Sequence, residues 1–76
     1  MTHNEKLEVW ILQALDALGG EGTITQIAKH VWENHESELR VSDDVFFKWQ
    51  YSMRWAGQRL QKAGKLKKHN RYWAKL

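Results

Sequence analysis

The chain contains no cysteine, and this absence constrains its fold more than any other feature of the sequence. At 76 residues it is near the small end of domains that fold alone, and neither a disulfide nor a thiolate metal site can stabilise it. The core must therefore come from apolar side chains, and five tryptophans supply large ones. With no proline and only five glycines, the chain does not resemble a disordered one. We expect a single domain over residues 1–76.

Acidic and basic side chains occupy different halves of the sequence. Residues 1–44 hold all nine acids and three bases, a net charge of −6, whereas residues 45–76 hold nine bases and no acid, a net charge of +9. A surface charged only for solubility mixes the two signs. Segregation of this kind indicates an anionic partner, and we expect nucleic acid in preference to an acidic protein or a membrane surface.

The first helix is predicted over residues 2–18. Its apolar side chains recur at helical spacing: Leu7, Trp10, Ile11, Ala14, Leu15 and Leu18. Thr2 lies three residues before Glu5, which is the spacing of a capping box, and Asn4 is the alternative cap. Gly19 and Gly20 end the helix, because glycine tolerates the left-handed backbone that follows a helix.

The next segment, EGTIT, is too short for an independent strand but can pair with a later one. A short second helix follows, capped by Thr23 or Thr25. Its apolar residues are Ile24, Ile27, Ala28, Val31 and Trp32. Residues 34–42 are polar and aperiodic, and we predict a structured loop there.

The third helix is predicted over residues 43–63. Ser42 followed by Asp43 and Asp44 is typical of a helix start, because the hydroxyl caps a free N–H and the carboxylates favour the positive end of the dipole. Gly64 ends this helix.

Beyond Gly64, two short strands are predicted, LKK (66–68) and RYWAKL (71–76), joined by a turn at His69 and Asn70. The predicted order is therefore helix, short strand, helix, helix and β-hairpin. This is a mainly α fold of the α+β class.

The third helix has two faces. At about 100° per residue, one arc carries the side chains expected in the core: Phe46, Trp49, Met53, Ala56, Leu60 and Ala63. The opposite face carries rings, cations and an amide: Phe47, Tyr51, Arg54, Trp55, Gln58 and Lys62, flanked by Lys48, Arg59 and Gln61. We expect Phe47 to be buried under the preceding loop and Trp55 to pack against the hairpin.

The outward face suits the major groove of DNA, which admits an α-helix. Arginine contacts guanine and glutamine contacts adenine through paired hydrogen bonds, while lysine holds phosphates. We therefore predict that the third helix contacts DNA through Tyr51, Arg54, Gln58 and Lys62, with Lys48, Trp55 and Arg59 beside them.

Two further elements complete the predicted interface. The hairpin is expected to contact the backbone or the minor groove through Lys65, Lys67, Lys68, Asn70 and Arg71. The alternative is an edge hairpin that lysines protect from aggregation. The start of the second helix, Thr25 and Gln26, is predicted to lie near a phosphate.

The order of elements is the plan of a winged helix-turn-helix, with three helices and a C-terminal β-hairpin wing. Residues 54–66, RWAGQRLQKAGKL, resemble the R-W-A-x-x-x-L-x-x-A-G-x-L ending of the N-terminal winged-helix domain of Mrr-type restriction endonucleases. Residues 7–31 resemble the opening helix pair of that domain. Arg54 and Trp55 match the family's Arg-Trp, and the packing positions match at Ala56, Leu60, Ala63 and Leu66.

The resemblance implies a DNA-binding domain that accompanies a nuclease domain, often in defence against modified DNA. No nuclease segment follows in this sequence, so we expect either an excised domain or a stand-alone binder. Tyr51, Trp55, Tyr72 and Trp73 are candidates to contact a methylated base, and the alternative is that these rings pack the wing.

No pattern indicates an enzyme, a metal site or a cofactor. His30 and His35 lie five residues apart instead of four, without a matching set of ligands. The glycines of residues 19–22 lack the Lys-Ser/Thr of a phosphate-binding loop. No apolar run approaches the ~18 residues of a membrane span, and no signal peptide is evident, so we expect a cytoplasmic protein without a membrane partner.

Two rival functions remain open from the sequence. The DNA-binding chain is expected to be a monomer or a weak homodimer. A protein-interaction module would use Phe47 and Trp55 as anchors, with weak salt dependence and a mass that depends on concentration. A binder of RNA or single strands would stack bases on the exposed rings.

Overall fold

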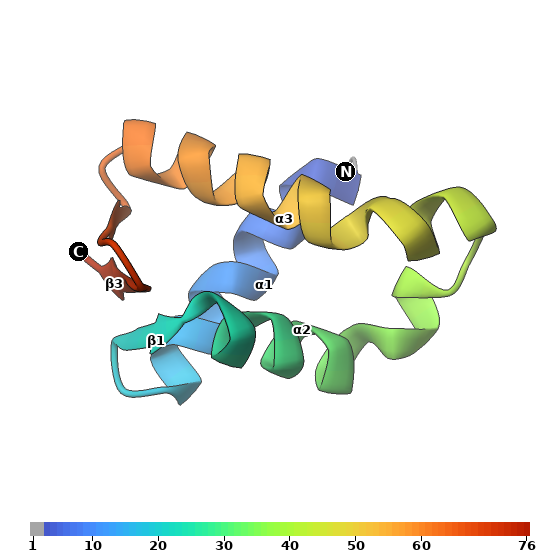
Figure 1. The fold of residues 1–76 in the computed structure, drawn as a ribbon, viewed down its shortest axis with the longest axis horizontal. Coiled ribbons are helices and arrows are strands. Elements are labelled where there is room, and N and C mark those ends of the chain that lie inside the picture. The colour runs from blue at the N-terminus through green and yellow to red at the C-terminus, as the bar shows by residue number, and fades with distance from the viewer. Residues whose placement is uncertain (1–2) are drawn as a thin grey trace.

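Periodic apolar residues and their caps produce three helices in the computed structural model, which describes residues 3–76 (Figure 1). They are α1 (His3–Ala17), α2 (Ile24–Leu39) and α3 (Asp43–Lys62). In Figure 1, α2 and α3 run along opposite sides of the molecule and α1 passes behind them. The predicted cap Thr2 lies outside the described residues, and Asn4 lies within α1.

The start of α2 settles which threonine caps it. Thr23 is the N-cap: its hydroxyl accepts from the Gln26 backbone N–H at 3.1 Å, and the Gln26 side chain accepts from the Thr23 N–H at 2.9 Å. This reciprocal pair is a capping box. Thr25 lies inside the helix, so the alternative cap is wrong.

The predicted loop over residues 34–42 is wrong, because α2 continues to Leu39. The helix bends at His35, whose φ of −136° is not helical. The His35 ring stacks on Trp10 of α1 with centroids 4.0 Å apart, and Leu39 is fully buried. These contacts with the core order the polar segment as helix and leave only residues 40–42 to connect α2 with α3.

α3 begins where predicted, with the Ser42 hydroxyl accepting from the Val45 N–H at 3.2 Å. Four of the predicted core residues are buried: Trp49, Met53, Ala56 and Leu60. Phe46 is half-buried, and Ala63 is exposed because it lies at the C-cap. Gly57, which the periodicity did not include, is also buried.

The strands form a small antiparallel sheet in the order β1-β3-β2. They are β1 (Glu21–Thr23), β2 (Leu66–Lys68) and β3 (Tyr72–Lys75). β1 pairs with β3 from Glu21 opposite Ala74 to Thr23 opposite Tyr72, so the early strand does pair with a later one. β2 and β3 form the predicted hairpin. The element order and the sheet order are those of a winged helix.

One core joins the helices to the sheet. Trp73 of β3 is 2% exposed and lies against Gly57, where an added Cβ would meet its ring at 2.4 Å. Gly57 therefore permits the hairpin to approach α3 closely. Within residues 3–76, no helix has the length and apolarity needed to cross a membrane.

Candidate nucleic-acid interface

The basic residues of α3 divide into two groups by their partners. Lys48 Nζ lies 3.0 Å from a carboxylate oxygen of Asp44, one turn earlier in α3. Arg59 Nε lies 3.7 Å from an oxygen of Glu8 on α1. These two predicted DNA contacts are thus paired within the protein, and Arg59 is half-buried besides. Both are less available to a phosphate than the sequence indicated.

Six cations keep no acidic partner among residues 3–76. All of them come from the second half of α3 and from the hairpin: Arg54, Lys62, Lys65, Lys67, Lys68 and Arg71. Five are exposed and Lys68 is half-buried. This uncompensated charge lies on the second half of α3, on β2 and on the turns before and after β2, and α3 packs against β2.

Lys68 joins the hairpin to the outward face of α3. Its Nζ lies 3.4 Å from the Arg54 carbonyl oxygen and 3.4 Å from the Gln58 Oε1, and it sits 5.0 Å from the centroid of the Trp73 ring. Burial, and then the nearby Arg54 guanidinium, lower the pKa of the Lys68 ammonium. Neutral acceptors hold this cation, so an arriving anion would find it uncompensated.

The rings on the outward face of α3 are more exposed than predicted. Phe47 is 79% exposed, so its predicted burial under the loop is wrong. Trp55 is 54% exposed and lies beside Tyr51, with ring centroids 6.2 Å apart, so its predicted packing on the hairpin is also wrong. Tyr51 itself is 67% exposed. Together with Gln58, which is exposed, these rings can contact a partner.

The wing rings behave differently from those on α3. Trp73 is buried against Gly57 and cannot line a contact with a base, so that part of the prediction is wrong. Tyr72 is partly exposed and stacks on His69 with centroids 4.5 Å apart. At the hairpin tip, Asn70 and Arg71 are both exposed, as a contact with a nucleic-acid backbone requires.

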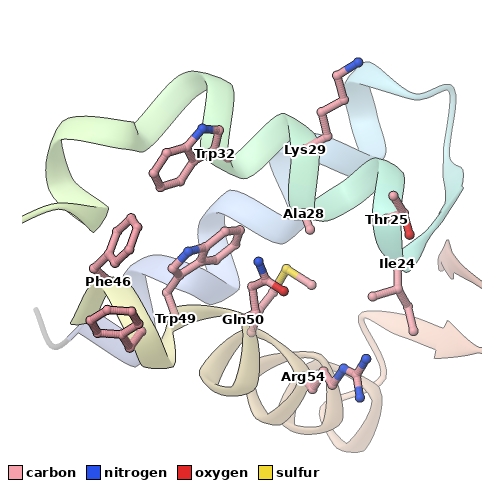
Figure 2. A pocket seen from close by; sticks show the side chains of 11 residues that line it. Ile24, Thr25, Ala28, Lys29, Trp32, Phe46, Trp49, Gln50 and Arg54 are labelled. Carbon is pink, nitrogen blue, oxygen red and sulfur yellow. The ribbon is translucent and has the colours of Figure 1, made fainter. Parts of the chain in front are cut away.

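The two predicted residues at the start of α2 have different roles. Gln26 uses its side-chain oxygen in the capping box, which leaves its amide N–H groups exposed. Thr25 is exposed and lines a groove between α2 and α3 (Figure 2). It therefore lies near α3 in space, although 29 positions separate it from Arg54 on the opposite wall.

No sequence pattern predicts that α2–α3 groove, whose volume is about 830 Å³. Residues from both helices line it: Ile24, Thr25, Ala28, Lys29, Trp32, Phe46, Phe47, Trp49, Gln50, Met53 and Arg54. Helical periodicity identifies the faces of a single helix, whereas a groove depends on the angle and spacing between two. The same holds for the ion pair between Arg59 and Glu8, which no local spacing predicts.

The described part of the chain contains no cluster of three or more His, Asp and Glu side chains that could hold a metal ion. No protein-family model matches the chain, and neither does any curated protein or solved structure.

Proposed function

We propose that this chain binds double-stranded DNA, with α3 in the major groove and the β2–β3 hairpin on the backbone or in the minor groove. The observation that carries the proposal is the set of six cations on α3 and the hairpin that pair with no acid within the described residues 3–76. Uncompensated cations on adjoining elements attract a polyanion, because neutralising phosphates releases condensed counterions.

The outward face of α3 carries side chains able to contact bases. The exposed Arg54 has the donor geometry for the two acceptors of guanine. Gln58 offers its amide group, although its oxygen already accepts from Lys68. We therefore expect Arg54 to contribute more to sequence preference than Gln58, and Lys62, Lys65, Lys67 and Arg71 to contact phosphates.

A titration of a labelled random-sequence duplex, followed by fluorescence anisotropy, tests the proposal. Arg54→Ala should weaken binding by about tenfold, or about 1.4 kcal/mol, which lies within the roughly 1–3 kcal/mol of an arginine contact. Lys48→Ala is the matched control on the same helix, and it should change the affinity little because Lys48 already pairs with Asp44. Equal losses in the two variants would contradict the role given to uncompensated charge.

The finer proposal rests on the resemblance to Mrr-type winged-helix domains. In that proposal the chain is the DNA-reading module of a modification-dependent restriction system, or a small cytoplasmic regulator, with a nuclease domain as partner. The exposed Tyr51 and Trp55 are the candidates to contact a methylated base. Equal affinity for methylated and unmethylated forms of one duplex, in adenine and cytosine contexts, would remove this finer proposal.

A protein-interaction or dimerisation module is the second candidate, and the exposed rings of Phe47, Tyr51 and Trp55 favour it. They repeat every four residues along α3 and so form one stripe. Exposed aromatic stripes of this kind serve as anchors in protein interfaces. Sedimentation equilibrium distinguishes the two functions: a dimer would show a mass that rises with concentration and changes little with salt.

A further inference from the structure

The α2–α3 groove is a second feature that DNA binding does not explain. Its volume is about 830 Å³, and it runs from Trp32 and Phe46 at one end to Ile24, Thr25 and Arg54 at the other (Figure 2). One wall is α2 and the other is α3. Only the end with Arg54 and Thr25 overlaps the proposed DNA-binding surface.

The floor of the groove is apolar. Met53 and Trp49 are 1% and 5% exposed and form its base, while Ala28 and Ile24 are half-buried on the side of α2. Phe47, on the opposite wall, is the most exposed large apolar side chain described. An apolar floor beside an exposed ring indicates an occupant that brings apolar side chains of its own.

The polar groups of the groove include donors but no carboxylate. Lys29 of α2 lines the groove, but its Nζ lies 3.8 Å from a carboxylate oxygen of Glu33. Arg54, on the opposite wall (Figure 2), keeps no acidic partner among the described residues, and Gln50 adds an amide. Trp49 is buried, and its indole N–H has no acceptor among the described residues. Donors without carboxylate partners along the groove favour an occupant that brings acceptor oxygens.

These properties select among classes of occupant. A DNA duplex stacks its apolar base faces inside and presents phosphates outside, so it offers nothing to the apolar floor. A single extruded base is flat and would cover only part of a groove lined from Trp32 to Arg54. An amphipathic helix places apolar side chains along one face at intervals of three and four residues, with polar groups beside them.

We propose that the α2–α3 groove docks a short amphipathic helix of a partner protein, one that carries acidic side chains beside its apolar ones. The apolar face would lie on Met53, Trp49 and Ala28, with Phe47 as an exposed anchor. The carboxylates would approach Arg54, because Lys29 already pairs with Glu33. This site lies outside the proposed DNA contacts except at Thr25 and Arg54, and it does not depend on DNA binding.

Selection from a phage library of random 16-residue peptides, with the full chain immobilised, tests the proposal without naming a partner. We expect recovered peptides to be acidic, with apolar residues at i, i+4 and i+7, and to bind at micromolar concentration. Phe47→Ala should lower the affinity of these peptides by about fivefold or more. Lys29→Glu places a second carboxylate beside Glu33 on the α2 wall. It should therefore weaken the binding of acidic peptides and favour peptides whose acidic residues are replaced by lysine.

Val9→Ala is the matched control, because Val9 is an exposed apolar residue of α1 that does not line the groove. It should leave peptide affinity unchanged. Two-dimensional amide spectra should locate the bound peptide, with shifts at Ala28 and Gln50 and at the indole N–H of Trp49. Far-ultraviolet circular dichroism confirms that each variant keeps its helices.

The proposal is overturned if the library yields no peptide, if the recovered peptides are basic, or if Phe47→Ala leaves their affinity unchanged. It is also overturned if Phe47→Ala weakens the binding of single-stranded DNA, because the groove would then accept a base. Phe47 and Lys29 are outside the set proposed to contact duplex DNA, so Phe47→Ala should retain duplex affinity. Loss of peptide binding and loss of DNA binding are therefore separate results.

Discussion

At the residue scale, the position of the wing depends on one glycine. Gly57 lies within α3, where glycine is the least favourable residue apart from proline. Its value lies in the missing Cβ, which leaves room for the Trp73 ring of β3. The contact places the hairpin, with its four cations, beside the outward face of α3. Sequence periodicity identified the core residues Trp49 and Met53 but not this glycine, because close approach between two elements leaves no local pattern.

Gly57→Ala should lower the free energy of unfolding by about 1–2 kcal/mol. Alanine normally stabilises a helix by about 1 kcal/mol relative to glycine, but here its Cβ would lie 2.4 Å from the Trp73 Cη2 atom. Urea denaturation measures the change. In a Trp73→Phe background, Gly57→Ala should lower the free energy of unfolding by less, since the smaller ring relieves the overlap with the new Cβ. A Gly57→Ala variant as stable as the parent would show that the ring moves aside freely.

Lys68 provides a pH-dependent test at the same scale. Its pKa is lowered from 10.5 by burial and then by Arg54, so the folded chain releases this proton at a lower pH than the unfolded chain. Between the lowered pKa and 10.5 the unfolded state holds more protons, and deprotonation there stabilises the folded state as pH rises. The stability of the parent relative to Lys68→Gln should therefore rise toward alkaline pH in urea denaturation. A difference that falls with pH would contradict the contacts assigned to Lys68.

At the element scale, α2 shows both what the sequence predicts and where it fails. The first turns were predictable, because Thr23 and Gln26 have capping-box spacing and Ile27 and Val31 share a face. The last turns were predicted as loop because residues 33–38 have no aliphatic residue. Leu39 lies eight residues after Val31 and so continues the face, with His35 between them. Because histidine is a polar residue, a search for apolar periodicity does not count His35, although its ring packs on Trp10.

The start of α2 provides a matched pair of threonines. Thr23→Ala removes the acceptor for the Gln26 N–H and should lower the free energy of unfolding by about 1 kcal/mol. Thr25→Ala, two positions later, removes an exposed hydroxyl with no capping role and should change stability by less than about 0.5 kcal/mol. Thermal or urea denaturation compares them. Equal effects would contradict the assignment of Thr23 as the cap.

At the scale of the whole molecule, the sequence predicted the segregation of charge but not how folding modifies it. Three acids of the first 44 residues pair with bases of the second half: Glu8 with Arg59, Asp16 with Lys75, and Asp44 with Lys48. Two of these pairs join segments far apart in the chain, which no spacing rule anticipates. Folding therefore concentrates the uncompensated charge on the C-terminal half of α3 and the hairpin. The predicted interface becomes smaller and more sharply located.

The salt dependence of duplex binding tests the central claim most directly. Fluorescence anisotropy of a labelled duplex at several salt concentrations gives the slope of log affinity against log salt. If four to six phosphates are neutralised, the slope should be about −4 to −5, and Lys67→Gln should make it less negative by about 1. A slope near zero, or no duplex binding even at low salt, would contradict DNA binding and would favour a protein partner for the basic surface.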